Sequence, residues 1–321
     1  MLPVLRFICM YCKAVSSTLV ALLVAPLALA QPMPFPASER VDFSLRYDIT
    51  SAADTRKITL TICVPADIEN RQKIVRKKYS IAPEKESQEN GSTYARIVIN
   101  NPPRSLKLTV DCETILYRYD LETALGKKGK AKAESRLSLA PFLAEEKYLE
   151  VNDTAIQKAA KSIPGGNDEQ AVRNVMDFVA QTLKKTPFDP ADHGAVWALQ
   201  NRHGDCTEFT DLFVTLCRAK GIPARACDGY ITTEIQKNDT AKHDWAEVYL
   251  DKCGWVPIDP LHTYMKIAAV DRLHPVYIQF GHQRVDKTLN GYHFNAWRYE
   301  GGEIEVQDSF AVTKRKVEPG K

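Results

Sequence analysis

The sequence lacks the charge imbalance that is typical of proteins that bind nucleic acids or anionic membranes. Its 321 residues contain 43 Lys and Arg against 40 Asp and Glu, which gives a formal net charge of only +3. Electrostatic attraction of that size does not favour a polyanionic partner, so we expect no nucleic acid. The basic run at residues 126–132 is short and contains glycine, which is more typical of a solvated loop than of a binding patch.

Long apolar runs are missing after residue 30. Residues 1–30 place basic side chains ahead of an apolar stretch, 14–29, and end in Ala-Leu-Ala, the small-x-small pattern that signal peptidase cuts. The sequence therefore predicts a signal peptide that is cut after Ala30, and a secreted or periplasmic protein without stable membrane insertion. The alternative is a retained membrane anchor, because 14–29 is almost long enough to span a bilayer if Pro26 is tolerated.

The motifs of common metal and nucleotide sites are also missing. The sequence contains no HExxH, keeps no CxxC pair once residues 1–30 are removed, and has no Gly-rich phosphate loop ahead of a helix. Cys206, His203 and His243 are residue types that bind zinc, but no motif spacing supports such a site. We therefore expect no metal and no cofactor.

Six cysteines remain after the predicted cut, in a compartment where disulfides form. If one thiol stays free for catalysis, five remain, and at least one of these must be unpaired or linked to another chain. Cys63 with Cys112 and Cys227 with Cys253 are the pairings to test first, because each pair falls on expected strands of one domain.

Strand periodicity dominates residues 38 to 125. Apolar residues alternate with polar ones over 41–49, 58–64 and 106–112, as expected of half-buried strands. Asn90-Gly91 lies between the apolar segments 75–81 and 94–99 and predicts a hairpin whose connection is longer than a two-residue turn. Together these signals predict an N-terminal antiparallel β-sandwich domain over residues 38–135.

Helical spacing follows the Lys-rich loop. Residues 154–163 and 195–200 read as short helices, and Asp168 is a plausible N-cap for a longer helix with an apolar stripe from Val172 to Leu183. Such a stripe is typical of a core, and we assign it no chemistry. The sequence predicts a second domain over 140–265. A strand-rich C-terminal extension over 266–321 is expected to pack on that core.

Cys206 is expected to open a helix. It follows Gly204-Asp205 and precedes an amphipathic stretch that ends at Gly221. At a helix N-terminus, unpaired N–H groups and the helix dipole stabilise a thiolate, and the same N–H groups bind the oxyanion of acyl transfer. The alternative interpretation is a disulfide partner or a small buried residue, which is the ordinary fate of a cysteine in an exported chain.

His243 has the setting of a general base among the seven histidines. It begins an expected strand, 243–250, and the turn at 251–254 reverses the chain toward Asp259. A hairpin of this kind places Asp259 near His243, where a carboxylate can fix the tautomer of the imidazole and stabilise its cation. Trp197 and Asn201 are candidates for a further oxyanion donor, although packing or capping explains each of them equally well.

The segments 201–230, 243–250 and 254–260 resemble the transglutaminase-like family. They bring a nucleophile motif, RAKGIPAR, HDWAEV and GWVPIDP together in order, which is far more specific than one motif alone. The resemblance implies an α+β protein with a papain-like core. It also implies that Cys206 is the nucleophile, His243 the base and Asp259 the orienting acid.

The activity implied by this resemblance is acyl transfer from a protein or peptide amide through a thioester on Cys206. An amine acceptor would make the protein a transglutaminase, whereas water would make it a cysteine protease or amidase, and the sequence leaves both open. A non-catalytic protein-binding scaffold is the alternative from another class, because this fold is reused after loss of the triad. The intact triad argues against that alternative.

Overall fold

The computed structural model describes residues 36–126, 134–233 and 242–317. The predicted signal peptide, residues 1–30, lies outside these ranges, as does the basic run except for Gly126. Residues from Phe35 onward cluster as a single unit. Within the described ranges, no helix has both the length and the apolar character needed to cross a bilayer.

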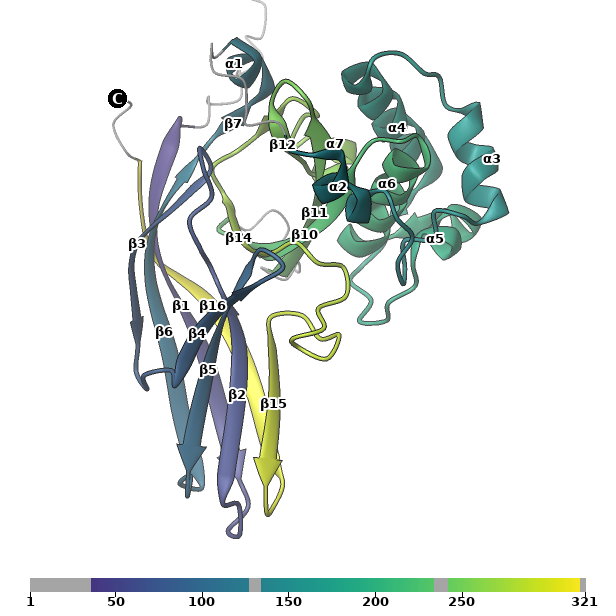
Figure 1. Cartoon of the computed structure of the whole chain (residues 1–321). Coiled ribbons are helices and arrows are strands. Elements are labelled where there is room, and N and C mark those ends of the chain that lie inside the picture. Colours follow the sequence, from purple (N-terminus) through teal and green to yellow (C-terminus); the bar gives the residue numbers. More distant parts are fainter. Residues whose placement is uncertain (1–35, 127–133, 234–241, 318–321) are drawn as a thin grey trace, which may run out of the picture. The chain divides into compact units, whose positions relative to one another are not determined.

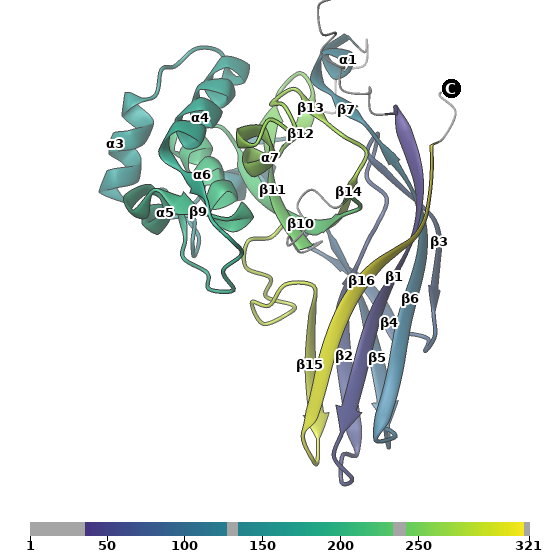
Figure 2. The ribbon, with the colours of Figure 1, turned by 180° about the vertical axis from the view of Figure 1, so that it is seen from behind.

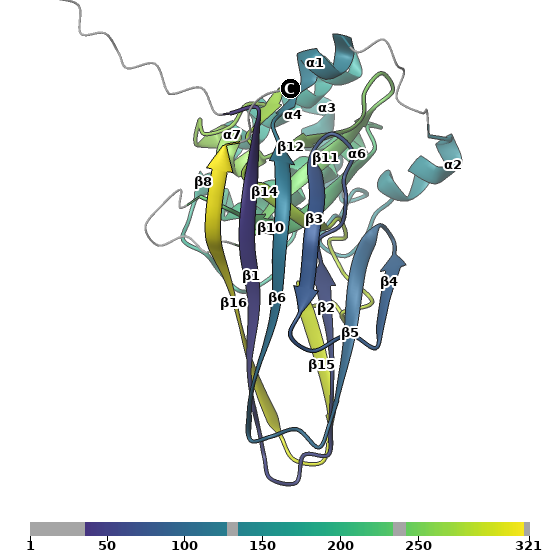
Figure 3. The ribbon, with the colours of Figure 1, turned by 90° about the vertical axis from the view of Figure 1, so that its left-hand side faces the viewer.

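Two four-stranded antiparallel sheets form a β-sandwich, with strand orders β16-β1-β6-β3 and β15-β2-β5-β4. Figure 3 shows the long strands β16, β1 and β6 side by side. The predicted alternation is confirmed, since Phe43 and Leu45 are 1% and 2% exposed. The strands are β1 (Ser38–Ser51), β2 (Lys57–Val64), β3 (Gln72–Tyr79), β4 (Lys85–Glu89), β5 (Ser92–Asn100), β6 (Ser105–Tyr117), β15 (Asn295–Glu300) and β16 (Ile304–Val317).

The Asn90-Gly91 hairpin is tighter than expected. These two residues join β4 directly to β5, with Glu89 paired to Ser92, and both have positive φ angles of 49° and 82°. Such angles fit a two-residue turn of the type that Asn-Gly favours. The expected longer connection is wrong because the charged segment 85–89 is itself a strand. The segment 75–81 contributes to β3, which pairs with β6 in the other sheet.

The C-terminal strands complete the sandwich. Strand β15 pairs with β2, and β16 pairs with β1 along most of its length. The expectation that residues 266–321 form an extension packing on the catalytic core is therefore wrong for these two strands. Each of these strands adds an edge strand to one of the two sheets. Their inward-facing side chains complete the apolar faces of both sheets. Strand β14 (Tyr277–Gly281) does join the core sheet, next to β10.

The core combines an antiparallel sheet, ordered β12-β11-β10-β14, with helices on one side of it (Figures 1 and 2). Helix α6 lies at its centre and packs against α3, α4, α5, α7, β10 and β11. The elements are α3 (Thr154–Ser162), α4 (Asp168–Thr182), α5 (Ala195–Asn201), α6 (Cys206–Ala219), β10 (Ala224–Ile231), β11 (Lys242–Leu250), β12 (Gly254–Ile258) and α7 (Pro260–Tyr264).

Short elements connect these parts. Strand β7 pairs with β13, and β8 pairs with β9 in parallel. Their bounds, with those of the short helices, are β7 (Tyr119–Asp120), α1 (Leu121–Gly126), α2 (Arg136–Leu139), η1 (Ala140–Phe142), β8 (Lys184–Lys185), β9 (His203–Gly204) and β13 (Arg272–Leu273).

The predicted helices are present, with one correction at a cap. Helix α4 begins at Asp168, but Asn167 is its N-cap, and the Asn167 side chain accepts a hydrogen bond from the backbone N–H of Gln170 at 2.9 Å. Asn and Asp cap helices equally well, so the sequence alone does not distinguish the two neighbours. The apolar stripe of α4 is buried, as predicted from its spacing.

A buried ion cluster joins the sandwich to the core sheet. Glu247 on β11 is fully buried and pairs with Arg71, just before β3, and with Arg225 on β10. Gln72 and Gln279 add two reciprocal hydrogen bonds of 3.0 and 2.9 Å between β3 and β14. Arg71 and Gln72 thus anchor the sandwich to the sheet that carries His243.

Candidate active site

Asp205 caps the helix that begins at Cys206. Its carboxylate accepts from the N–H of Thr207 at 2.9 Å, and its own backbone N–H donates to the Glu208 carboxylate at 3.0 Å, which completes a capping box. Glu208 needs the space that Gly204 leaves, because a Cβ on Gly204 would lie 2.3 to 2.8 Å from the Glu208 side chain. The sequence Gly-Asp-Cys-x-Glu therefore fixes the helix start at Cys206.

Cys206 is half-buried at the first position of α6. A backbone N–H at this position has no acceptor within its own helix, so it remains available to a substrate oxygen. The helix dipole also favours negative charge on the sulfur. The predicted helix-opening position of Cys206 is confirmed.

His243 and Asp259 meet as the hairpin geometry predicts. Strand β11 pairs with β12, with Ala246 opposite Ile258, and Asp259 follows directly. The Nε2 of His243 lies 2.7 Å from Asp259 Oδ2, and both side chains are buried. Because Nε2 faces the carboxylate, Nδ1 is the ring nitrogen left for the hydrogen bond that His243 shares with Cys206. The structure thus brings the three predicted residues together.

Electrostatics couple the three groups. Burial opposes charge on His243, yet the Asp259 carboxylate holds the pKa of the imidazole well above its ordinary value. Burial also opposes charge on Asp259, but His262 and His243 hold its pKa well below the usual range. Burial raises the pKa of the Cys206 thiol, and the hydrogen bond from His243 acts in the opposite direction. A thiolate at this site therefore depends on a protonated His243 beside it.

Two residues that the sequence analysis did not single out complete the surroundings of Asp259. The Tyr277 hydroxyl donates to Asp259 Oδ2 at 2.7 Å, and His262 Nδ1 lies 2.7 Å from the same oxygen. The His262 ring stacks on His243, with centroids 4.4 Å apart, and its backbone N–H donates to Asp259 Oδ1 at 2.8 Å. His262 follows Asp259 by one helical turn, a spacing that could have indicated it, whereas Tyr277 arrives from β14 without a local signal.

A second hydrogen bond links the two elements that carry the predicted nucleophile and the predicted base. Thr207, next to Cys206, donates from its hydroxyl to Asp244, next to His243, at 2.7 Å. The sequence analysis assigned no role to either residue. Because each side chain is adjacent to a predicted triad member, this bond fixes the distance between the start of α6 and the start of β11.

His243, Asp259 and His262 form a cluster of residue types that bind metals, with their ligand atoms within 4.8 Å of one another. A zinc ion holds N and O ligands at about 2.0 to 2.2 Å in a tetrahedron, which separates neighbouring ligand atoms by roughly 3.4 Å. Here both histidines contact the Asp259 carboxylate at 2.7 Å. These distances fit direct hydrogen bonds. His203, which the sequence analysis considered for zinc, lies on β9 against Trp197.

The two candidate oxyanion donors on α5 are engaged elsewhere. Asn201 donates from its side chain to the carbonyl of Trp197 at 2.9 Å, and the Trp197 ring stacks on His193 with centroids 4.0 Å apart. Neither residue lines the cleft beside Cys206. Capping and packing therefore account for both, and the Cys206 backbone N–H is the donor that the helix start supplies.

The expected disulfide pairings are wrong. The six cysteines in the described residues are all free thiols. Cys63 and Cys112 lie on strands of opposite sheets, and the Cys63 thiol contacts the Phe280 carbonyl at 3.6 Å. Cys227 accepts from the Gln279 side chain at 3.5 Å, whereas Cys253 lies in the turn between β11 and β12. Each buried thiol is packed separately in its own surroundings.

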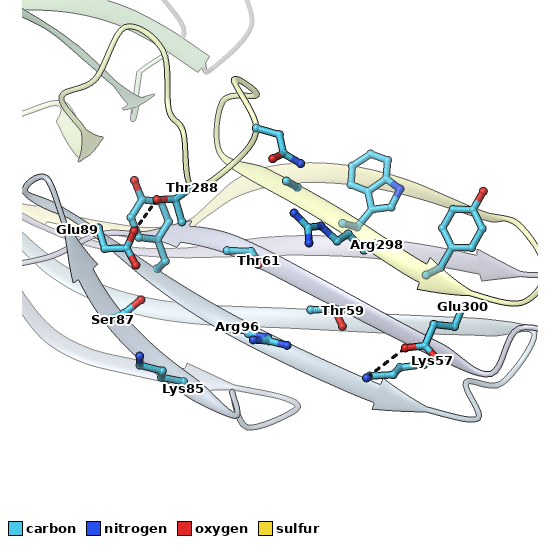
Figure 4. A pocket seen from close by; sticks show the side chains of 15 residues that line it. Lys57, Thr59, Thr61, Lys85, Ser87, Glu89, Arg96, Thr288, Arg298 and Glu300 are labelled. Atoms are coloured by element: carbon cyan, nitrogen blue, oxygen red, sulfur yellow. Dashed lines mark hydrogen bonds and ion pairs between the residues drawn. The ribbon is translucent and has the colours of Figure 1, made fainter.

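The cleft at the triad is small, about 30 Å³, and its lining includes Cys206, His243 and His262. A wider hollow of about 590 Å³ lies on the sandwich sheet β15-β2-β5-β4 (Figure 4). Lys57, Thr59 and Arg298 line it, and Lys57 pairs with Glu300 at 3.3 Å. No cysteine or histidine lines that hollow, where the Thr288 hydroxyl donates to the Glu89 carboxylate at 2.8 Å. The chemistry is assigned to the small cleft, where Cys206 lies beside His243.

Comparisons with known proteins match part of the sequence to a family. Residues 157–260 match the family model of the transglutaminase-like superfamily. The uncharacterized protein YebA of Bacillus subtilis (strain 168) is 31% identical over 96 residues, which cover 26% of this chain. The match spans only 13% of the length of that relative.

Solved structures resemble the chain over a longer stretch. A structure from Cytophaga hutchinsonii, described as a candidate cysteine protease, has a TM-score of 0.57 at 18% identity and covers 87% of this chain and 93% of its own. The periplasmic domain of TgpA from Pseudomonas aeruginosa has a TM-score of 0.37 at 13% identity, with 72% and 91% covered. At 18% identity, the likeness to the Cytophaga hutchinsonii structure concerns the fold alone. The match to the family model, and not the likeness to these structures, identifies residues 157–260 as a transglutaminase-like domain.

Proposed function

We propose that the protein is a cysteine enzyme that transfers acyl groups from a protein or peptide amide through a thioester on Cys206. The observation that carries the proposal is the hydrogen-bonded chain from Cys206 through His243 to Asp259 at the start of α6. A nucleophile, a base and an orienting acid in contact are the combination that thioester chemistry requires.

The reaction follows from the contacts. Cys206 passes its proton to His243 and attacks the carbonyl carbon, while the Cys206 N–H stabilises the oxyanion. The carbon–nitrogen bond then breaks, His243 gives the proton to the departing amine or ammonia, and a thioester remains. The acceptor, an amine or water, attacks next and returns its proton to His243, which restores the thiol. Asp259 holds the ring in the required tautomer throughout.

Iodoacetamide labelling tests the nucleophile. We expect Cys206 to react faster than an ordinary free thiol at neutral pH, and His243→Ala to slow it by at least about tenfold, because the base contributes about 10²- to 10⁴-fold in related chemistry. Reaction at the rate of a free thiol, with no effect of His243→Ala, would rule out the catalytic proposal in favour of a binding scaffold.

Mass spectrometry separates the two acceptors. Wild-type protein and Cys206→Ala are incubated with exported proteins and a primary amine. Amine incorporation marks transfer, new termini mark proteolysis, and conversion of glutamine to glutamate marks hydrolysis of a side-chain amide. Each of these outcomes supports acyl transfer through Cys206, and the outcome observed identifies the acceptor. Identical products from wild type and Cys206→Ala would contradict all three.

Export is part of the proposal. It rests on the basic, apolar and small-residue pattern of residues 1–30. Removal of residues 1–30 should retain the protein in the cytoplasm, whereas the full chain should yield a mature form that begins at Gln31. A full chain that stays attached to the membrane with residues 1–30 intact would support the anchor instead.

A further inference from the structure

Phe188 is a large apolar side chain at the cleft that contains Cys206 and His243. Its side chain is 59% exposed, and Phe188 lines the same cleft as the two triad members. Single exposed apolar residues are common on proteins, so exposure alone carries no meaning. What sets Phe188 apart is its location beside the nucleophile.

The backbone around Phe188 is held in place. We call residues 184–189 the strap. The backbone N–H of Lys184 donates to the Arg202 carbonyl at 3.1 Å, and that of Thr186 donates to the Gly204 carbonyl at 2.9 Å. On the far side of Phe188, the N–H of Asp189 donates to the Asp205 carboxylate at 2.8 Å. These three bonds tie the strap to the segment that leads into Cys206.

The remaining walls of the cleft agree with an apolar occupant. Ile231 on β10 and Leu261 on α7 line it with 4% and 5% of their surface exposed. The two histidines of the cleft, His243 and His262, already bond to Asp259. Lys185, the basic side chain at the cleft, also has a partner within the protein. Asp205, whose carboxylate also lines the cleft, disfavours an acidic group there.

We infer that the cleft selects substrates with an apolar side chain next to the reacting carboxamide, and that Phe188 is the residue that contacts it. The inference rests on the proposed function, because it names the substrate class for acyl transfer at Cys206. Apolar contact is favourable through the water it releases from both surfaces. A ring on a fixed strap makes that contact with little loss of conformational freedom.

Alkylating probes test this inference without a known substrate. The full chain is treated with N-benzyl iodoacetamide, which is apolar, and with N-carboxymethyl iodoacetamide, which is anionic. In each reaction a carbon–sulfur bond forms and iodide leaves, so turnover is not needed. The rate at Cys206 is divided by the rate at Cys253, which is half-buried in a turn and corrects for the intrinsic reactivity of each probe.

In the wild-type protein, we expect the benzyl probe to react about tenfold faster than the carboxymethyl probe, as apolar pockets discriminate about 10- to 200-fold. Phe188→Ala should reduce this ratio to about twofold or less, while Phe188→Leu should retain most of it. Tyr292→Ala removes another exposed aromatic ring, 66% exposed and outside the cleft, and should leave the ratio unchanged.

Unsubstituted iodoacetamide keeps this test separate from that of the proposed function. Its rate at Cys206 in the wild-type protein tests the proposed function alone, and the circular dichroism spectrum of Phe188→Ala shows that the variant is folded. A ratio near one in wild type, a faster carboxymethyl probe, or a ratio that survives Phe188→Ala would overturn the inference while Cys206 remains reactive. Ordinary reactivity of wild-type Cys206 toward iodoacetamide would instead contradict the proposed function.

Discussion

The hydroxyl of Thr207 donates a hydrogen bond to the carboxylate of Asp244 at 2.7 Å. Each residue follows a member of the proposed triad, so the bond ties the start of α6 to the start of β11 without taking part in the proposed proton transfer. A shift of about 1 Å between reacting groups is enough to cost about 10²-fold in rate.

Replacing Thr207 with valine should slow the chemistry through misplacement. We expect Thr207→Val to lower kcat by about tenfold and to destabilise the protein by about 1 kcal/mol, because Asp244 loses a donor. Thr210→Val, one turn along the same helix, is the matched control. The Thr210 hydroxyl is buried, with no hydrogen-bond partner among the described residues, so valine should be neutral or stabilising. Equal kcat values in the two variants would show that the Thr207 bond has no positioning role.

Tyr277→Phe should shift the acidic limb of the rate–pH profile for alkylation of Cys206. The Tyr277 hydroxyl stabilises the charged form of Asp259, whose pKa lies well below its usual range. Loss of the donor raises that pKa, so Asp259 becomes protonated at a higher pH as the pH falls. Once protonated, Asp259 no longer stabilises the His243 cation. We expect the limb to move up by about one pH unit in a rate–pH profile. Tyr249→Phe, which removes a hydroxyl bonded to the Glu134 backbone, should leave the profile unchanged.

Glu247→Gln should destabilise the junction between sandwich and core by about 3 to 5 kcal/mol, because Arg71 and Arg225 lose their shared buried anion. Urea unfolding measures the change. Glu300→Gln, which breaks an exposed pair with Lys57, should cost less than about 1 kcal/mol. Similar losses in both variants would contradict the assignment of Glu247 as the anchor.

The same carboxylate predicts a pH dependence of stability. The two arginines outweigh burial and hold the pKa of Glu247 well below its ordinary value. Its contribution is therefore present above the unfolded pKa of about 4.3 and is lost as the pH falls toward the folded value. Wild-type stability should fall more steeply than that of Glu247→Gln below about pH 5. Parallel curves would show that Glu247 is not the titrating group.

Thiol labelling of the folded protein should modify Cys206 and Cys253 and leave the buried cysteines intact. Denaturant should then expose the other four, Cys63, Cys112, Cys217 and Cys227. Because the six cysteines of the described residues are free thiols, a reductant should not change the thermal midpoint. A peptide in which Cys63 is linked to Cys112 would contradict the free-thiol arrangement.

Local patterns predicted the parts of the fold that depend on nearby residues. The alternation through Phe43 and Leu45 gave the strands, and the chain order of Cys206, His243 and Asp259 placed the candidate site because one helix start and one hairpin assemble it. The predicted longer connection of the hairpin was wrong because β4 contains only polar and charged residues, so no apolar alternation marks it as a strand. The partners of β15 and β16 were missed because pairing between distant segments leaves no periodic signal. Tyr277 was missed for the same reason.

The pairing of β16 with β1 has a consequence for synthesis of the protein. The transglutaminase-like segment is encoded between the two portions of one sandwich, so β1 lacks one neighbour until the last described strand has left the ribosome. An unpaired strand edge of that length is a template for aggregation. A chain truncated before Ile304 would retain every residue of the triad and still expose this edge. Such a truncation should therefore make the protein insoluble, although the residues proposed for the chemistry of Cys206 are intact.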